Sequence, residues 1–135
     1  MSLLLRLDET LVANREAVSA LVEHIMETVS DMGCAAGREF EVRLAIVEAL
    51  TNAIEHGCQN DPTRKIQICV LCDEEHGMLI IVQDPGPGFD PASIPSPVVG
   101  KNIFATHGRG IFLINLMVDE VRFERGGTEI HMRIK

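Results

Sequence analysis

Glu48 and Asn52 stand four residues apart in a strongly helical stretch, and this spacing puts a carboxylate and a carboxamide on one helix face. A carboxylate can accept a proton, and a carboxamide oxygen is a ligand for hard cations. Two glycine-containing segments, residues 84–88 and 108–110, follow this pair in order. Together, the three segments predict a nucleotide-binding site.

Asp84 stands at the end of an apolar run, residues 78–83, which is typical of a central strand. Proline and glycine alternate directly after it, and this pattern excludes a helix. Gly86 and Gly88 allow the backbone to approach a ligand closely, while the prolines stiffen the bend. A plain proline-rich turn would explain the glycines, but it gives no reason for an acid where a buried strand ends.

Residues 91–107 contain three prolines and little periodicity, and they predict a long loop of the kind that forms lids over binding sites. Gly108 and Gly110 then open a predicted helix that runs to Val118. Its first amide groups are free to bind phosphate. Arg109 either pairs with that phosphate or is an ordinary exposed arginine.

The length of 135 residues predicts one domain, residues 1–135, with its own core. The net charge of −8 and the pI near 5.0 argue against nucleic acid or an anionic membrane as the principal partner. No apolar run approaches the ~20 residues that cross a bilayer, and residues 1–6 lack the features of a secretory signal. We therefore expect a cytoplasmic location.

The chain has four cysteines, and the spacing of Cys69 and Cys72 resembles zinc or redox motifs. Residues 66–72 read as a strand, however, so these two side chains point to opposite faces, and no second pair has ligand spacing. We predict buried, reduced thiols at all four positions, which include Cys34 and Cys58.

The remaining pattern predicts helices followed by strands. Residues 3–7 form a short strand, and Asp8 or Thr10 caps a helix that runs to about Met32 and ends at Gly33. A second helix covers residues 38–56 and stops at Gly57. Its predicted apolar stripe, with Glu48 and Asn52 at the border, consists of Leu44, Val47, Thr51, Ile54 and Cys58.

The C-terminal half predicts two hairpins. Strands at residues 66–72 and 78–83 are joined by a turn, and strands at 121–125 and 128–134 meet at a two-residue turn, Gly126-Gly127. In the last strand Ile130, Met132 and Ile134 are expected to face the core, and Glu129, His131 and Arg133 to face water. His56 is either a helix C-terminal imidazole or a functional group. Thr128 is either a strand residue or a hydroxyl that faces the cleft.

The chain resembles the anti-sigma-factor serine kinases, a branch of the ATPase superfamily that also contains gyrase-type topoisomerases and histidine kinases. Residues 48–56 resemble the first nucleotide box of the family, and residues 84–88 the second. Residues 108–113 resemble the third box, and Gly127-Thr128 the last. The resemblance implies an α+β fold of the Bergerat type, a two-layer sandwich of helices on one mixed, largely antiparallel sheet.

The resemblance also implies roles for individual residues around ATP and Mg²⁺. Glu48 would be the general base toward the attacking hydroxyl, and Asn52 would hold Mg²⁺. Asp84 would accept from the adenine amino group, with support from Thr128. Gly86 and Gly88 would shape the adenine pocket, and Gly108 and Gly110 would let the lid and the helix start close on the phosphates. Arg109 and Lys101 are the cations that the lid region offers to the γ-phosphate.

From the family we expect an ATP-dependent protein serine/threonine kinase that binds and inhibits a sigma factor and phosphorylates an anti-anti-sigma protein. The resemblance further implies a homodimer. Two alternatives remain at this point: a nucleotide-dependent binding switch without catalysis, and the catalytic fragment of a histidine kinase. The histidine-kinase alternative is disfavoured, because no dimerisation and phosphoacceptor helix pair precedes the site in this sequence.

Overall fold

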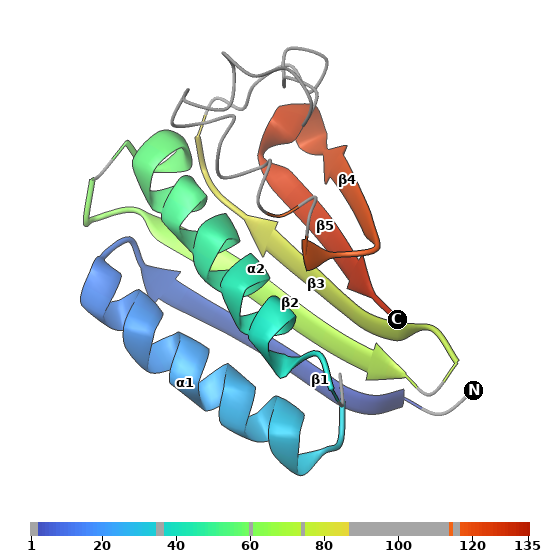
Figure 1. The fold of residues 1–135 in the computed structure, drawn as a ribbon. Coiled ribbons are helices and arrows are strands. Elements are labelled where there is room, and N and C mark those ends of the chain that lie inside the picture. The colour runs from blue at the N-terminus through green and yellow to red at the C-terminus, as the bar shows by residue number, and fades with distance from the viewer. Residues whose placement is uncertain (1–2, 35–36, 60, 74, 87–113, 115–116) are drawn as a thin grey trace.

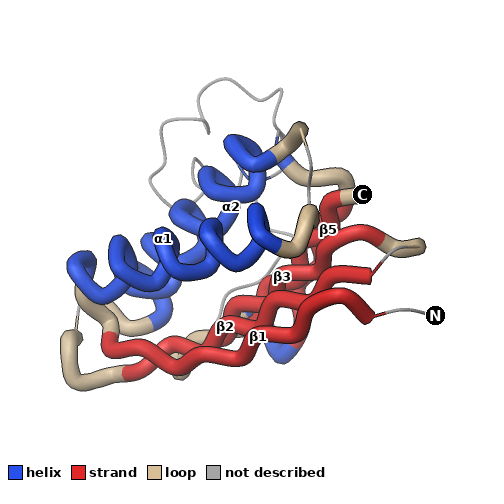
Figure 2. The backbone as a smooth tube through the Cα atoms, turned by 90° about the horizontal axis from the view of Figure 1, so that it is seen from below, coloured by secondary structure: helices blue, strands red, loops and turns tan. Residues whose placement is uncertain are grey.

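The structure is a computed structural model, and it describes residues 3–34, 37–59, 61–73, 75–86, 114 and 117–135. In this part of the chain, two helices cover one face of a five-stranded sheet with the order β1-β2-β3-β5-β4 (Figure 1). Seen along the layers, both helices lie on the same side of the strands (Figure 2). The predicted α+β sandwich is confirmed, and every pairing between the described strands is antiparallel rather than mixed.

The first strand is longer than predicted. β1 (Leu3–Val12) continues through Asp8 and Thr10, which we expected to cap the first helix. Both residues are exposed and alternate with more buried neighbours, as in a strand with one face on the core, and β1 pairs with β2 throughout. α1 (Arg15–Asp31) instead begins after Asn14, whose side chain accepts from the amide of Ala17 at 2.7 Å.

α2 (Glu39–Asn52) agrees with the predicted second helix, but its last turn is different. Residues Ala53–Gly57 form a π-helical turn, in which the amide of Cys58 donates to the carbonyl of Ala53 at 2.8 Å. The predicted apolar stripe was wrong within α2, because the buried face of the helix lies about one position away. That face consists of Val42, Ala45, Ile46, Ala49 and Leu50, and it continues to Ala53 and Ile54 in the π turn.

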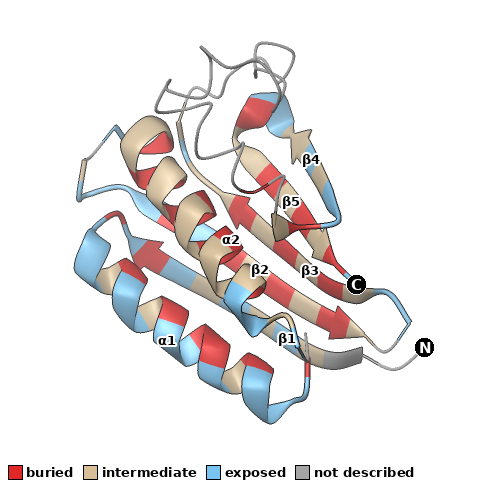
Figure 3. Cartoon of the chain, in the orientation of Figure 1, coloured by how far each residue is buried: buried red, intermediate tan, exposed pale blue. Residues whose placement is uncertain are grey.

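The central strands agree closely with the sequence pattern. β2 (Lys65–Asp73) and β3 (Gly77–Gln83) alternate between buried and more exposed side chains, as does β5 (Glu129–Ile134). Their buried sides meet the helices (Figure 3), and Ile130, Met132 and Ile134 face this core as predicted. Among the described residues, the buried set contains no polar or charged side chain. The core is therefore held by apolar burial.

The C-terminal hairpin differs from the two-residue turn that we expected. β4 (Glu120–Glu124) and β5 are joined by residues 125–128, which include a 3₁₀ turn at Arg125–Gly127. Arg125 has a φ of 53°. Glu129 and His131 do not face open water either, because their side chains are only 15% and 14% exposed and form a pair at 2.6 Å.

The prediction of four reduced thiols was wrong for two of them. Cys34 and Cys72 form a disulfide with a Cα–Cα distance of 6.4 Å, within the range that disulfides bridge. They stand 38 residues apart in sequence and meet only through the packing of the helix layer on the sheet, which strand periodicity does not reveal. Cys58 and Cys69 remain free thiols.

The predicted helix that starts at Gly110 lies mostly outside the described residues. Ile114 and Met117 are helical, and the amide of Val118 donates to the carbonyl of Ile114 at 3.0 Å. No helix in the described part of the chain is long and apolar enough to span a membrane.

Candidate functional site

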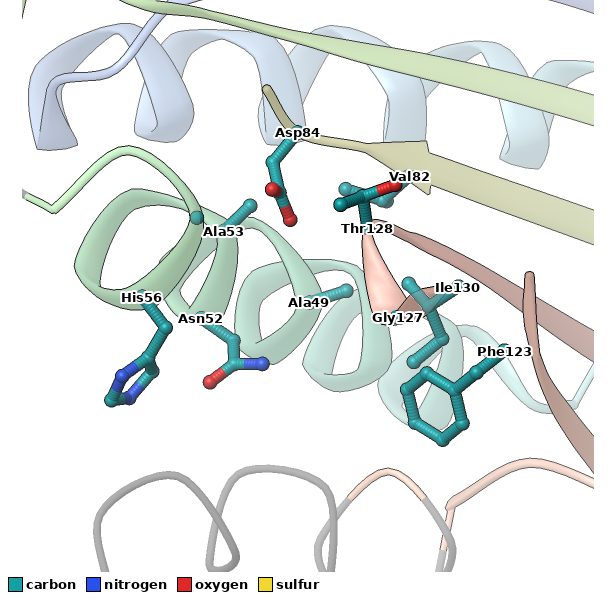
Figure 4. Close-up of a pocket in the computed structure, with 11 residues that line it drawn as sticks. Ala49, Asn52, Ala53, His56, Val82, Asp84, Phe123, Gly127, Thr128 and Ile130 are labelled. Carbon is teal, nitrogen blue, oxygen red and sulfur yellow. The ribbon is translucent and has the colours of Figure 1, made fainter. Parts of the chain in front are cut away.

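A pocket lies between the C-terminal part of α2, with its π turn, and the adjacent ends of β3, β4 and β5. Its lining is part apolar and part polar: Ala49, Asn52, Ala53, His56, Gly57, Val82, Asp84, Phe123, Gly127, Thr128 and Ile130. Figure 4 shows Asp84 and Asn52 entering the pocket region from different elements, the end of β3 and α2. A flat apolar body with polar substituents would fit such walls.

Asp84 is held in place by hydrogen bonds with main-chain groups of Thr128 and Gly86. Its amide donates to the carbonyl of Thr128 at 2.9 Å, and its Oδ1 accepts from the amide of Gly86 at 2.8 Å. Burial raises the pKa of Asp84 above its usual value, while the Gly86 amide acts in the opposite direction. Because Oδ1 is engaged by Gly86, Oδ2 is the oxygen best placed to accept from a ligand.

Close packing explains why Gly57 and Gly86 are glycines. A Cβ on Gly57 would stand 2.2 Å from Cγ of Asp84, and a Cβ on Gly86 would stand 2.3 Å from the carbonyl oxygen of Gly57. We predicted Gly57 as a helix stop, and Gly86 as a glycine that lets the backbone approach a ligand and shapes the adenine pocket. The structure shows that both glycines seat the aspartate against the π turn.

Asn52 and His56 line the pocket from the helix side. Together with Ala49 and Ala53 they form a stripe at spacings of three and four residues, which is one face of a helix. The π turn widens the backbone between Ala53 and Gly57, directly where the helix meets Asp84. Such turns often occur at functional sites.

Thr128 lines the pocket, but its hydroxyl has another partner. The hydroxyl donates to the carbonyl of Arg125 at 2.9 Å, while the main-chain carbonyl of Thr128 accepts from the Asp84 amide. The link from Thr128 to Asp84 in this structure is therefore made by the main chain. Support through the side chain stays a prediction.

The other predicted site residues divide into two groups. Glu48 lies on α2, one turn before Asn52 and half-buried, and it does not line the pocket itself. Outside the described residues are Gly88, Lys101, Gly108, Arg109 and Gly110. The pocket therefore joins the first, second and last boxes of the resemblance, and the third is not described.

Sequence reasoning missed the apolar walls, which are Ala49, Ala53, Val82, Phe123 and Ile130. Two signals were available. The stripe of small residues beside Asn52 repeats every three to four positions, and Val82 stands two positions before Asp84 on the same face of its strand. Phe123 gave no comparable signal, because its approach depends on how β4 pairs with β5.

Comparisons with known proteins agree with this architecture. The family described as "Histidine kinase-like ATPase domain" matches residues 11–134. An anti-sigma F factor of Oceanobacillus iheyensis is 30% identical over 125 residues, which are 87% of this chain and 79% of that protein. An anti-sigma F factor of Geobacillus kaustophilus is 28% identical over 124 residues, covering 88% and 80%.

A solved structure also shares the fold. The crystal structure of the RsbU and RsbW domains of a Mycobacterium tuberculosis protein matches with a TM-score of 0.62 and 18% identity, covering 96% of this chain and 31% of that one. At this identity the likeness concerns the fold alone. With the family match over nearly its whole length, the chain belongs to the histidine kinase-like ATPase domain family, and within it to the anti-sigma factors.

Proposed function

We propose that this protein is an ATP- and Mg²⁺-dependent protein serine/threonine kinase that also binds and inhibits a sigma factor. Its substrate would be a serine of a small anti-anti-sigma protein. The observation that carries the proposal is the pocket in which Asp84 and Asn52 enter from different elements, in a chain of the anti-sigma-factor family.

The pocket offers the contacts that an adenine nucleotide needs. Oδ2 of Asp84 would accept from the exocyclic amino group, and the ring would lie against apolar side chains such as Val82 and Ile130. The phosphates would extend toward Asn52. This orientation leaves the base beside Asp84, where Gly57 and Gly86 fix the position of the carboxylate.

The carboxamide of Asn52 would fit a magnesium ion at the pocket wall. The described residues contain no group of three or more His, Cys, Asp or Glu side chains arranged to hold a metal. The carboxamide of Asn52 is a hard oxygen ligand at the pocket wall, and Mg²⁺ in phosphoryl-transfer sites is commonly bound by few protein groups. When bound, the ion supplies charge neutralisation for the transferred phosphoryl group.

Glu48 would take the proton from the attacking serine hydroxyl. It stands one helical turn before Asn52, so a base and a metal ligand would come from the same face of α2. Phosphoryl transfer depends mainly on positioning and charge neutralisation, and a carboxylate within reach of the hydroxyl completes the set.

The test is incubation of the protein with γ-labelled ATP, Mg²⁺ and candidate anti-anti-sigma proteins. We expect label on a serine of one candidate, and loss of that label with Glu48→Gln while nucleotide binding persists. Asn52→Ala is expected to abolish Mg²⁺-dependent ATP binding. Nucleotide-dependent partner binding without label would show a switch rather than a kinase, and label on a histidine would contradict the serine assignment.

The inhibitory role is tested separately, by binding of sigma factors from the source organism with and without ATP. We expect one sigma factor to bind more tightly in the presence of ATP, and its transcription in vitro to fall. If no sigma factor binds in either condition, the regulatory part of the proposal is wrong, whatever the kinase assay shows.

A further inference from the structure

Cys34 is positioned by the way in which α1 ends. The amide of Gly33 donates to the carbonyl of Ser30 at 3.1 Å, and the amide of Cys34 donates to the carbonyl of Val29 at 3.0 Å. This pair of bonds is a Schellman motif, which requires a left-handed residue, here Gly33 with a φ of 72°. The motif turns Cys34 inward, where it is only 3% exposed.

Cys72 comes from the other layer. It lies on the buried side of β2, one residue before the end of the strand, and pairs with Leu5 and Met78. The register between β1 and β2 shifts between Leu3 and Leu5, directly beside this position. The disulfide therefore ties the α1–α2 connection to a strand end where the ladder is already irregular.

The loop that the bond closes contains the helix wall of the pocket. Residues 34–72 include α2, the π turn and nearly all of β2, and therefore Asn52, His56 and Gly57. Cross-linking the two ends of a segment reduces the entropy of its unfolded state. The bond thus favours the folded state of this segment without contributing a side chain to the pocket.

The surroundings of the two cysteines differ: Cys34 lies in the connection after α1, whereas Cys72 lies on β2 between β1 and β3. The connection between α1 and α2 has glycines with positive φ on both sides of Cys34, Gly33 at 72° and Gly37 at 83°, each with open space where a Cβ would stand. We therefore expect reagents to reach the bond through a local opening on the Cys34 side rather than by global unfolding.

We propose that Cys34 and Cys72 form a reversible redox couple that sets the stability of the segment from residue 34 to residue 72. The co-reactant is a low-molecular-weight disulfide and its thiol. One protein thiolate attacks the small disulfide and releases one small thiol, and the second protein thiolate then displaces the other. Two protein thiols are oxidised to one disulfide, and the small disulfide is reduced to two thiols, which carry the protons.

The other two cysteines serve as internal controls. Cys58 is buried, and burial raises the pKa of its thiol. Cys69 faces the opposite side of β2 from Cys72, and burial with a hydrogen bond to Asp8 raises its pKa to about 11. A raised pKa disfavours the thiolate that exchange requires. Among the described cysteines the bridge joins Cys34 and Cys72 and leaves Cys58 and Cys69 as free thiols, so the couple is expected to be selective.

The experiment equilibrates the full chain with glutathione disulfide, quenches it with acid, and labels thiols with N-ethylmaleimide in denaturant. Mass spectrometry should find two adducts, on Cys58 and Cys69, and four adducts after dithiothreitol is added to the folded protein. Four adducts after oxidation, or a bridge that involves Cys58 or Cys69, would overturn the pairing. A bond that dithiothreitol reduces only in denaturant would overturn its reversibility.

The stability effect is read from thermal unfolding. Oxidation should raise the Tm by on the order of 10 °C. Cys34→Ser should remove this difference and Cys69→Ser should retain it, and equal Tm values for oxidised and reduced wild-type protein would refute the stabilising role. Neither the thiol labelling nor the thermal unfolding uses nucleotide. A negative result for the redox couple would therefore leave the proposed kinase function standing, and a negative kinase assay would leave the redox couple standing.

Discussion

Asp84→Asn should change which base the pocket accepts. Oδ1 of Asp84 accepts from the amide of Gly86 at 2.8 Å, and an asparagine keeps that bond only by pointing its amide oxygen at Gly86. Its NH₂ group then occupies the position of Oδ2, so the pocket presents a donor where it presented an acceptor. The amino group of adenine would meet this donor, whereas the carbonyl oxygen of hypoxanthine would be matched.

The magnitude follows from one hydrogen bond to a charged group, which is worth about 2 kcal/mol. We therefore expect ATP affinity to fall by about 30-fold and the affinity for inosine triphosphate to rise by a similar factor. Calorimetric titration with each nucleotide measures both, and circular dichroism checks the fold. The matched control is Asp61→Asn, because Asp61 accepts from the amide of Thr63 at 2.9 Å in the same kind of turn, away from the pocket.

Two results would refute this reasoning. If Asp84→Asn weakens both nucleotides equally, the residue supports the pocket but does not read the base. If ATP binds the variant as tightly as it binds the wild type, Oδ2 does not contact the base at all. An effect of the same size in Asp61→Asn would mean that the change is one of general stability.

Three further predictions concern the same framework. Since burial raises the pKa of Asp84 above 3.8, the folded state holds its proton over a window where the unfolded state does not. The contribution of Asp84 to the free energy of unfolding therefore falls as pH rises through that window. ATP affinity needs the carboxylate, so it falls as pH drops into the same window. Denaturant and ATP titrations over a pH series measure the two trends. Gly86→Ala should cost about 2 kcal/mol of stability and at least about tenfold in ATP affinity, because its Cβ meets backbone atoms. The control Gly126→Ala should cost about 1 kcal/mol of stability and leave ATP affinity unchanged. Equal ATP affinities for the two variants would contradict this prediction. Arg38→Met should cost about 2 kcal/mol in urea unfolding, because Arg38 binds two carboxylates and two main-chain carbonyls. Arg122→Met should cost under about 0.5 kcal/mol, because the Arg122 side chain is 69% exposed in its pair with Glu124. Similar losses would show that the Arg38 contacts contribute no more than a surface pair.

Periodicity predicted the central strands well because their environment is simple. β2, β3 and β5 each have one face against the helices, so the alternation of side chains records burial directly. β1 was harder, because Asp8 and Thr10 are helix-capping residue types that here occupy the exposed face of a strand. Their type is compatible with both structures, and only the pairing with β2 decides between them.

The site was predicted as far as its polar groups stand at the ends of recognisable elements. Asp84 was placed at a strand end from sequence, and the structure gives that position a pocket. The glycine contacts behind it could not be predicted, because Gly57 and Gly86 meet only when the π turn packs against the end of β3. The pairing of Cys34 with Cys72 has the same character, since it depends on contact between the two layers.

These observations share one physical cause. The described core contains no buried polar side chain, and three polar residues of the pocket stand where a regular element begins or ends. Asp84 follows β3, Thr128 precedes β5, and Asn52 is the last residue of α2 before the π turn. A binding pocket assembled from three such ends can change its polar groups without disturbing the core, and that is why Asp84→Asn should alter binding more than it alters the fold.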